Sequence, residues 1–351
     1  MVTALMRALT VIPGKAGTAQ LDDLPPPADQ GVRLAPLAVG ICGTDAEIVR
    51  GEYGWAPPSR ERLVLGHECI ARVAEGAAGF KTGDLVVPIV RHPDPVPCSS
   101  CAAGEWDMCR NGLYTEHGIK QIDGFCAESV RVPAEFLVPV APALDRHAVL
   151  VEPTSVVAKA WEHIERIGNR AHWQPRRVLV TGAGPVGLLA ALLGRQRGFE
   201  VMLFDRVTTG IRPKLAAAID AGYVTGPLES HLADWPPDIV LECTGATPVI
   251  IDVLRQNAPG CVTCLVGVSS QGKPVPVDVG AMNRSLVLEN DVVFGSVNAN
   301  RRHYQQAAAA LAAAKPEWLE ALISRRVPLD RWQDALARQP DDVKVVLEIA
   351  A

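Results

Sequence analysis

The pattern of apolar and polar positions changes near the middle of the chain. Up to about Val140, the apolar positions fall in short β-type segments that Gly and Pro interrupt, such as GVRLAPLAVG and GDLVVPIV. Such segments are typical of an irregular all-β unit. From about Val178, apolar runs such as RRVLVTG, FEVMLFD and DIVLECTG alternate with helix-type segments such as PVGLLAALLGRQRG. This alternation predicts an α/β protein with βαβ units in a doubly wound parallel sheet.

The alternation stops near Gly295, where the segment RRHYQQAAAALAAA follows. Because alanine has the highest helix propensity and brings no chemistry, this segment predicts one packing helix. The chain has 351 residues, which is more than one hydrophobic core usually organises. We therefore expect two domains.

Charge and composition exclude some classes of partner. Lys and Arg total 34 against 39 for Asp and Glu, which gives a net charge of −5, and no basic stripe is interleaved with aromatic residues. Nucleic acid is therefore not an expected partner. The first residues show no secretory leader, and the longest uncharged run, residues 178–194, contains four glycines and a proline. We expect a cytoplasmic protein without a membrane partner.

A glycine-rich turn lies between the first strand and the first helix of the predicted parallel sheet. In VLVTGAGPVGLLAALL, the glycines allow a tight turn and let the backbone approach a pyrophosphate at the helix N-terminus. The turn therefore predicts a dinucleotide cofactor. The expected cofactor-binding residues of the turn are Gly182, Gly184, Pro185, Val186 and Gly187.

Asp205 ends the next apolar run, VMLFD, about 20 residues after the turn, where a carboxylate binds the adenosine ribose. We therefore predict a nicotinamide cofactor, with NAD as the first choice because Asp205 would repel a 2′-phosphate. Arg206, Arg212 and Lys214 follow closely and could accept that phosphate, so NADP stays open.

Two segments of the first half carry side chains that bind zinc. VGICGTDAEIVRGEYGW contains Cys42, and LVLGHECIARV contains His67 next to Glu68. A thiolate, an imidazole and a carboxylate are ligands that a catalytic zinc uses while one position stays open. Neighbouring residues of an extended strand point to opposite faces. His67 and Glu68 can therefore share one metal only if the chain bends, which Gly66 makes plausible.

A third segment, DPVPCSSCAAGEWDMC, places Cys98, Cys101 and Cys109 in one loop. The chain contains nine cysteines, and in a reducing compartment these are expected to bind metal or to be buried. A structural zinc takes four protein ligands, so this loop lacks one. CVTC at residues 261–264 has similar spacing but lies in a predicted buried strand, and we interpret it as core.

Together these motifs resemble the zinc-dependent medium-chain dehydrogenase/reductase family over nearly the whole chain, through GICGTD, GHE, the cysteine loop, VEP and GAGPVG. Within that family, GICGTDAEIVRGEYG, LVLGHE, EHGIKQIDGF, VEPTSVVAKA and GSVNAN resemble the glucose 1-dehydrogenase branch. The resemblance implies a GroES-like catalytic zinc domain of residues 1–155 and 298–351, and a Rossmann dinucleotide-binding domain of residues 156–297. It also implies a homo-oligomer, either a dimer or a tetramer.

The resemblance assigns roles around the catalytic zinc. Cys42, His67 and Glu68 would surround the ion. Glu152, in VEPTS, stands where many relatives carry another ligand or a group that contacts the zinc-bound water, and it would also face the substrate. Whether Glu68 and Glu152 bind directly or alternate is left open. Asp45 would orient the ligand His67, or it would cap the following helix.

The resemblance also implies a reaction. The C1 hydride of an aldose, with D-glucose as the first choice, would pass to C4 of the nicotinamide and give gluconolactone. Thr44 would take the proton of the C1 hydroxyl, and Glu116 and Asn298 would hydrogen-bond other hydroxyls of the sugar. Val90 stands where some relatives have an asparagine that faces the sugar, so another aldose or an amino or deoxy sugar stays open.

The cysteine loop departs from the pattern of the family. There the lobe zinc is held by four cysteines spaced C-x2-C-x2-C-x7-C, and the first of these falls on Pro95, which cannot bind metal. Asp94 or His92 could supply the fourth ligand, because both side-chain types bind zinc. We interpret the loop as a structural brace that lies apart from the reaction.

Two alternative functions remain at this point. A polyol or secondary-alcohol dehydrogenase would use the same zinc and the same cofactor. A cofactor-binding subunit without turnover would have no need for an open zinc site, so the set of Cys42, Thr44, His67 and Glu68 argues against it.

Overall fold

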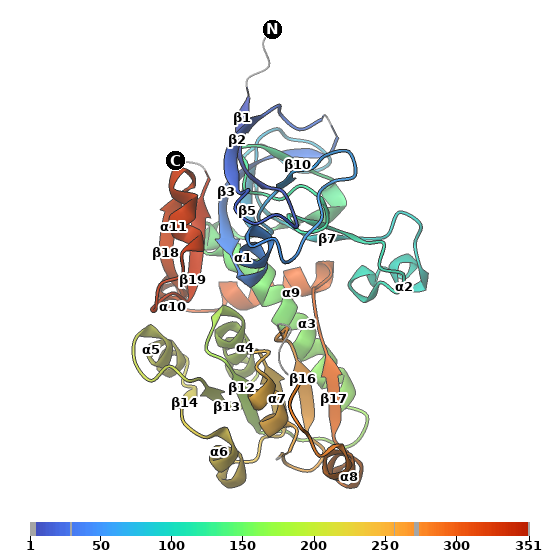
Figure 1. Cartoon of the computed structure of the whole chain (residues 1–351), viewed down its shortest axis with the longest axis vertical. Helices are drawn as coiled ribbons and strands as arrows, with labels where there is room; N and C mark the ends of the chain where they lie inside the picture. Colours follow the sequence, from blue (N-terminus) through green and yellow to red (C-terminus); the bar gives the residue numbers. More distant parts are fainter. Residues whose placement is uncertain (1–4, 29, 256, 270–273, 350–351) are drawn as a thin grey trace. The chain divides into compact units, whose positions relative to one another are not determined.

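The computed structural model describes residues 5–28, 30–255, 257–269 and 274–349 (Figure 1). The chain forms two compact units. The first unit comprises Met1–Ser155 and Ala299–Ala351, and the second comprises Val156–Asn298.

The first unit is built mainly from antiparallel sheets. Its strands are β1 Met6–Val11, β2 Gln20–Leu24, β3 Val32–Ile41, β4 Leu63–Val64, β5 Glu68–Val73, β6 Leu85–Pro88, β7 Arg91–His92, β8 Thr115–His117, β9 Gln121–Ile122, β10 Val130–Val132, β11 Leu137–Pro139, β18 Ile323–Pro328 and β19 Lys344–Glu348. The central sheet has the order β11-β6-β5-β3-β19-β18, with β10 also paired to β3, and smaller sheets have the orders β2-β1-β4 and β7-β8-β9.

Strand β3 connects the sequence pattern to the core. Its apolar side chains at Val32 and Leu34 are buried, while the residues that follow each of them are half-buried, as a period of two requires. β19 pairs with β3 in antiparallel fashion, with Val345 opposite Ile41. The C-terminal part of the chain therefore lies beside the strand that leads to Cys42 (Figure 1).

Short helices connect the strands of the first unit. They are α1 Gly43–Val49, α2 Ser99–Ala102, α9 Arg301–Ala312, α10 Pro316–Leu322 and α11 Trp332–Leu336, with 3-10 turns η1 Trp106–Met108, η2 Ala134–Phe136, η3 Pro142–Leu144, η4 Ala148–Leu150 and η5 Leu329–Arg331. The alanine-rich segment forms α9, which is capped by Asn300 and buries Tyr304 and Leu311. It is thus a packing helix. Helix α3, Val151–Gly168, begins in this unit and continues into the second.

The second unit is a parallel sheet with the strand order β14-β13-β12-β15-β16-β17. The strands are β12 Arg177–Thr181, β13 Glu200–Phe204, β14 Gly222–Val224, β15 Ile239–Glu242, β16 Val262–Leu265 and β17 Val292–Gly295, and the helices between them are α4 Pro185–Gln196, α5 Ile211–Ala218, α6 Leu228–Asp234, α7 Thr247–Val253 and α8 Val279–Glu289. The order reverses at β12, so the sheet is doubly wound. The predicted fold class is confirmed.

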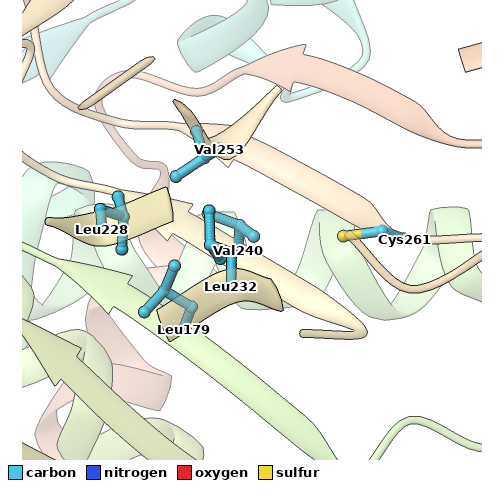
Figure 2. Close-up of a cluster of buried hydrophobic side chains, with 6 residues drawn as sticks. All are labelled: Leu179, Leu228, Leu232, Val240, Val253 and Cys261. Atoms are coloured by element: carbon cyan, nitrogen blue, oxygen red, sulfur yellow. The ribbon is translucent and has the colours of Figure 1, made fainter. Parts of the chain in front are cut away.

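A buried apolar cluster packs α6 and α7 against the sheet of the second unit. It consists of Leu179, Leu228, Leu232, Val240, Val253 and Cys261 (Figure 2). Cys261 is fully buried, as is Cys264, and burial raises the pKa of both thiols. The CVTC segment is thus core. Across the described ranges, none of the helices combines the length and the hydropathy that crossing a bilayer would take.

Candidate active site

Cys42 lies where strand β3 ends and helix α1 begins. Its sulfur accepts a hydrogen bond from the backbone N–H of Thr44 at 3.2 Å, and its own N–H donates to Asp45 Oδ2 at 2.9 Å. These reciprocal bonds form a capping box, which satisfies N–H groups that a helix start leaves free. The GICGTD sequence thereby fixes the position of the Cys42 thiol and places Thr44 on the first turn of α1.

His67 contacts both side chains of this capping box, those of Cys42 and Asp45. Its Nε2 lies 3.1 Å from Cys42 Sγ, and its Nδ1 lies 3.4 Å from Asp45 Oδ1. Burial alone would lower the pKa of His67, but the charges of Cys42 and Asp45 outweigh burial and hold the pKa well above its usual value. The imidazole is thus held between a thiol and a carboxylate.

The chain adopts a left-handed backbone conformation at Gly66, directly before His67. Gly66 has a φ of +92°, and a Cβ there would lie 2.5 Å from Cys126 Sγ. Only glycine meets both requirements without strain. The backbone at this position therefore requires glycine, while the bend that would bring His67 and Glu68 to one metal stays a prediction. Glu68 nevertheless belongs to the paired part of β5, where it lies opposite Gly40 of β3. Its direct ligation of a metal stays a prediction.

Glu68 forms a buried ion pair with Lys344 of β19. The Lys344 ammonium also donates to the carbonyl of Ile41 at 3.2 Å. The exposed fraction is 2% for Glu68 and 1% for Lys344, so each charge depends on the other. The side chain of Glu68 passes over Gly40, where a Cβ would lie 2.1 Å from Glu68 Oε2. Gly40 is therefore needed for this pair.

Glu152 lies in the first turn of helix α3. Burial, and then the negative charge of Glu68, raise the pKa of Glu152 to about 7, while the charges of His67 and Lys344 act in the opposite direction. The carboxyl group can therefore hold or release a proton near neutral pH. Its role as a ligand or as a substrate contact stays a prediction.

The residues around His67 fit a zinc ion. The ligand atoms of Cys42, Asp45 and His67 all lie within 4.8 Å of one another. A thiolate and an imidazole are common zinc ligands, and a carboxylate at the other nitrogen of the imidazole is the usual support of such a histidine. Cys42 and His67 would thus hold the ion, and Asp45 would orient His67.

The cysteine loop brings its three thiols together. The sulfurs of Cys98, Cys101 and Cys109 lie within 4.8 Å of one another. Backbone N–H donation, chiefly from Arg110, lowers the pKa of Cys98 to about 6, whereas burial raises the pKa of Cys101 to about 11. Three clustered thiols are suitable ligands for a structural zinc.

The fourth ligand of this loop stays a prediction. Asp94 accepts hydrogen bonds from the Val96 N–H at 2.9 Å and from the Asn111 amide. Asn111 also accepts a hydrogen bond from Cys109 Sγ at 3.0 Å, so Asp94 is linked to the thiols through one side chain. His92 instead stacks on Phe136 at a centroid distance of 3.8 Å. Burial lowers the pKa of His92 to about 2.

Glu116 lies on β8, where its carboxylate is fixed by Arg91. The Arg91 guanidinium donates to Glu116 Oε1 through Nε at 3.0 Å, and both side chains are buried. The guanidinium also lies over the ring of Tyr114, 3.7 Å from its centroid. Val90, the residue before Arg91, donates its N–H to the hydroxyl of Tyr304 at 3.2 Å.

Asn298 lies in the second unit, after strand β17. Its φ of +61° is left-handed, a conformation that Asn adopts more readily than most residues. The preceding carbonyl, that of Val297, accepts a hydrogen bond from the buried Lys159 ammonium at 3.0 Å. Lys159 thus fixes the backbone next to Asn298, whose contact with substrate stays a prediction.

The glycine turn joins β12 to α4 as expected. A Cβ at Gly187 would lie 1.8 Å from the carbonyl oxygen of Gly182, so close packing excludes other residues there. Gly184 is the N-cap of α4 and Pro185 opens the helix. A Cβ at Gly184 would meet nothing within 4 Å, which leaves space at the helix N-terminus for a pyrophosphate.

Asp205 directly follows the last residue of β13, beside this turn. Its carboxylate accepts hydrogen bonds from the N–H groups of Ala183 at 2.6 Å and Val207 at 2.9 Å. Arg212 lies 3.7 Å away and balances the charge of the carboxylate. Arg206 is exposed at the same strand end. The arrangement thus combines a carboxylate for a ribose with arginines that could accept a phosphate.

A first unit with a Cys–His pair on a GroES-like β scaffold, and a second unit with a glycine turn on a doubly wound sheet, define a zinc-dependent medium-chain dehydrogenase. Residues 28–142 match the Alcohol dehydrogenase GroES-like domain, and residues 145–349 match the family described as Glucose dehydrogenase C-terminus. The chain belongs to the glucose dehydrogenase family. The relationship that the sequence motifs implied is therefore confirmed.

Individual relatives match along the whole chain. The glucose 1-dehydrogenase of Methanocella arvoryzae is 36% identical over 99% of this chain and 100% of its own length. Glucose 1-dehydrogenase 2 of Vulcanisaeta moutnovskia is 40% identical over 98% of this chain and 99% of its own. The structure of Haloferax mediterranei glucose dehydrogenase in complex with NADP, Zn and gluconolactone has a TM-score of 0.92 at 28% identity, and the match covers 99% of this chain and 100% of that chain.

Three buried cations near these groups were missed by sequence reasoning: Arg91, Lys159 and Lys344. Lys344 stands in the apolar run VKVVLEIA, where an isolated charge is unexpected. A lone lysine in an apolar run could have indicated that Lys344 is buried beside a charged partner. The identity of the partner could not have been found from local spacing, because Glu68 lies far away along the chain.

Proposed function

We propose that this chain oxidises the C1 hydroxyl of an aldose, with D-glucose as the first choice, to the lactone and transfers the hydride to NAD or NADP. The observation that carries the proposal is the Cys42–His67–Asp45 arrangement in a member of the glucose dehydrogenase family. Relatives named glucose 1-dehydrogenase match it over nearly their full length, and the Haloferax enzyme is described with NADP, Zn and gluconolactone.

Each residue around the proposed zinc has a separate role in the reaction. Zinc held by Cys42 and His67 would supply a Lewis acid that lowers the pKa of the C1 hydroxyl. Asp45 keeps the His67 ring in position. Thr44 receives the proton of the C1 hydroxyl while it passes its own hydroxyl proton outward to solvent. Glu152, whose carboxyl group lies within electrostatic range of His67, is a second group that can exchange a proton there.

Other residues position the two reactants. Glu116, fixed by Arg91, accepts hydrogen bonds from sugar hydroxyls, and the resemblance to the family assigns the same role to Asn298. The turn from Gly182 to Gly187 takes the pyrophosphate, and Asp205 takes the adenosine ribose. Because Arg212 already balances the charge of Asp205, a 2′-phosphate is less strongly repelled, and we propose that both NAD and NADP are accepted.

A panel assay tests this function. Purified protein is mixed with NAD or NADP and with aldoses, polyols or secondary alcohols, and the absorbance of the reduced nicotinamide is followed; protein treated with a chelator is the control. We expect turnover with aldoses and lactone as the product. Turnover with polyols or secondary alcohols but not aldoses would instead establish the alternative alcohol dehydrogenase, and no turnover with any of them would contradict the assignment.

We also propose that the chain forms a homo-oligomer through the second unit. Helix α8 has no buried residue, and the exposed fractions of Val279, Val287 and Leu288 are 70%, 65% and 60%. Strand β17 beside it is the last of its sheet. Apolar side chains gathered at a sheet edge are typical of a subunit interface. Light scattering on the wild type and on Leu288→Lys should show a smaller particle for the variant.

A further inference from the structure

Two aromatic side chains are exposed together on the loop that follows α1. Tyr53 is 42% exposed and Trp55 is 47% exposed. Their rings meet edge to face, with centroids 5.1 Å apart and planes at 73°. Within the ranges that the structure describes, no other Phe, Tyr or Trp is exposed to this degree. We refer to Tyr53 and Trp55 as the aromatic pair.

The backbone beneath the aromatic pair is fixed on two sides. The N–H of Trp55 donates to the carbonyl of Ile119 at 2.9 Å, and its carbonyl accepts from the N–H of Gln121 at 2.9 Å. On the other side, Gly54 has a φ of +95°, and a Cβ there would lie 3.1 Å from the buried Ile48 of α1. The backbone that carries the aromatic pair is therefore packed between α1 and the turn before β9.

The same turn carries Glu116. The N–H groups of Ile119 and Lys120 donate to the carbonyl of Glu116 at 3.1 and 2.8 Å, and the Glu116 N–H donates to the carbonyl of Lys120 at 2.8 Å. Trp55 forms a parallel bridge with Lys120. The backbones of Trp55 and of the proposed sugar-binding residue are thus joined through one short turn.

The electrostatic field at Tyr53 agrees with this placement. Burial raises the pKa of the Tyr53 phenol, and the charge of Glu116 raises it further, while Arg91 acts in the opposite direction. The carboxylate that is fixed by Arg91 therefore lies within electrostatic range of the Tyr53 phenol.

An aromatic surface whose backbone is hydrogen-bonded to the turn that carries a fixed carboxylate suits a particular ligand. Binding sites combine apolar and aromatic walls with a few placed polar groups. A pyranose has C–H groups on its ring faces and hydroxyls around its rim, so its face can pack on a ring while its hydroxyls donate to a carboxylate. An open-chain polyol offers no such rigid face.

We propose that the aromatic pair is a stacking surface for the pyranose ring of the substrate, next to Glu116. The enzyme would then bind the cyclic form of a sugar and discriminate against open-chain polyols. This inference rests on the proposed function, because it extends the contacts of the same sugar beyond its C1 hydroxyl.

The test uses a ligand that binds without reacting. 1,5-Anhydro-D-glucitol keeps the pyranose ring but has no hydroxyl at C1, and D-glucitol is its open-chain counterpart. Their dissociation constants are measured by saturation-transfer NMR on the wild type, Trp55→Ala, Tyr53→Ala and Trp55→Phe. Leu5→Ala, which truncates an apolar side chain of the first unit that is 61% exposed, is the matched control.

We expect Trp55→Ala and Tyr53→Ala each to weaken binding of 1,5-anhydro-D-glucitol by about 3- to 10-fold, as loss of an aromatic contact does. Trp55→Phe, which keeps an aromatic face, should retain most of the affinity, and Leu5→Ala should match the wild type. For D-glucose, KM should rise in the alanine variants while KM for the nicotinamide cofactor stays constant. Weaker binding of D-glucitol than of the anhydro sugar by the wild type would also support the proposal.

The outcomes separate this inference from the proposed function. If the wild type oxidises aldoses but both alanine variants bind the anhydro sugar as tightly as Leu5→Ala does, the stacking surface is refuted and the function stands. If the anhydro sugar binds through the aromatic pair but no aldose is oxidised, the proposed function fails and the binding surface stands. A wild type that does not bind the anhydro sugar would overturn the stacking surface. Melting temperatures confirm that each variant is folded.

Discussion

Asp45 supports two neighbours with one carboxylate. Oδ2 accepts the N–H of Cys42 and completes the cap of α1, while Oδ1 lies 3.4 Å from His67 Nδ1. Helix capping and orientation of His67 were alternative interpretations of the sequence, and the structure contains both contacts. One side chain thereby couples the start of a helix to the position of His67, the proposed zinc ligand.

Substitutions at Asp45 can separate its contact with the Cys42 N–H from its contact with His67. Asp45→Asn keeps a side-chain oxygen that can accept the N–H of Cys42, the N-cap of α1, but removes the charge that supports His67. We expect zinc affinity to fall by about 10- to 100-fold, with little change in melting temperature. Asp45→Ala should also lose the hydrogen bond from the Cys42 N–H and cost about 1 kcal/mol more in stability, as the loss of a typical hydrogen bond does. Competition with a chromogenic chelator measures the affinity, and an unchanged zinc affinity in Asp45→Asn would refute the support of His67.

Glu152 makes the stability of the metal-free protein depend on pH. Its pKa is raised from 4.5 to about 7 in the folded state. A raised carboxyl pKa means that the folded state binds the proton more tightly, so this contribution to stability is present below pH 4.5 and is lost as the pH rises through 7. Denaturant titrations of chelated protein between these pH values should show the decline, and Glu152→Gln should flatten it. An identical decline in the variant would assign the effect to another group.

At the scale of elements, three strands meet at the Glu68 carboxylate. β5 supplies Glu68, β3 supplies the glycine that makes room for it, and β19 supplies Lys344. The pairing of β3 with both β5 and β19 sets these positions, because a slip of one residue would turn each side chain to the opposite face. Strand register therefore determines which charged side chain lies against Glu68.

Removing one member of the buried pair should be costly. Lys344→Met leaves Glu68 without its counter-charge, and breaking a buried pair in this way costs about 3–5 kcal/mol. Urea titration measures the loss. The double variant Lys344→Met/Glu68→Gln should recover much of it, because no unpaired charge is then left. Lys344→Arg keeps the charge and is the control. Equal stability of the double and the single variant would show that the ion pair is not the cause.

At the scale of the whole molecule, the parts that local sequence determines were predictable. The glycine turn follows from a strand, three glycines and a helix within a short segment, and the thiols of the cysteine loop follow from their spacing. The partners of Glu68 and Glu116 were not predictable, because Lys344 and Arg91 reach them through sheet pairing, which one sequence does not reveal. The exposure of Tyr53 and Trp55 likewise depends on packing of a loop against α1 and β9.

Zinc content tests the two cysteine environments together. We expect about two zinc ions per chain, one in each environment. Cys98→Ser should lose one ion and lower the melting temperature, because a structural zinc contributes to folding free energy, with turnover surviving at low temperature. Cys42→Ser should lose the other ion and abolish turnover with a modest change in melting. Elemental analysis gives the counts, with Cys243→Ser as the control, and a single zinc that Cys98→Ser retains would show that the loop is metal-free.

The pairing of β19 with β3 has a consequence for synthesis on the ribosome. The second unit is continuous in sequence, from Val156 to Asn298, so it can fold as soon as that stretch has emerged. The first unit is interrupted by it, and its central sheet cannot close until Lys344–Glu348 has been translated. Until then the edge of β3 that pairs with β19 has no partner strand, and Glu68 has no Lys344 to balance its charge. A stalled nascent chain that ends before β19 should therefore bind the nucleotide while its metal site is still incomplete.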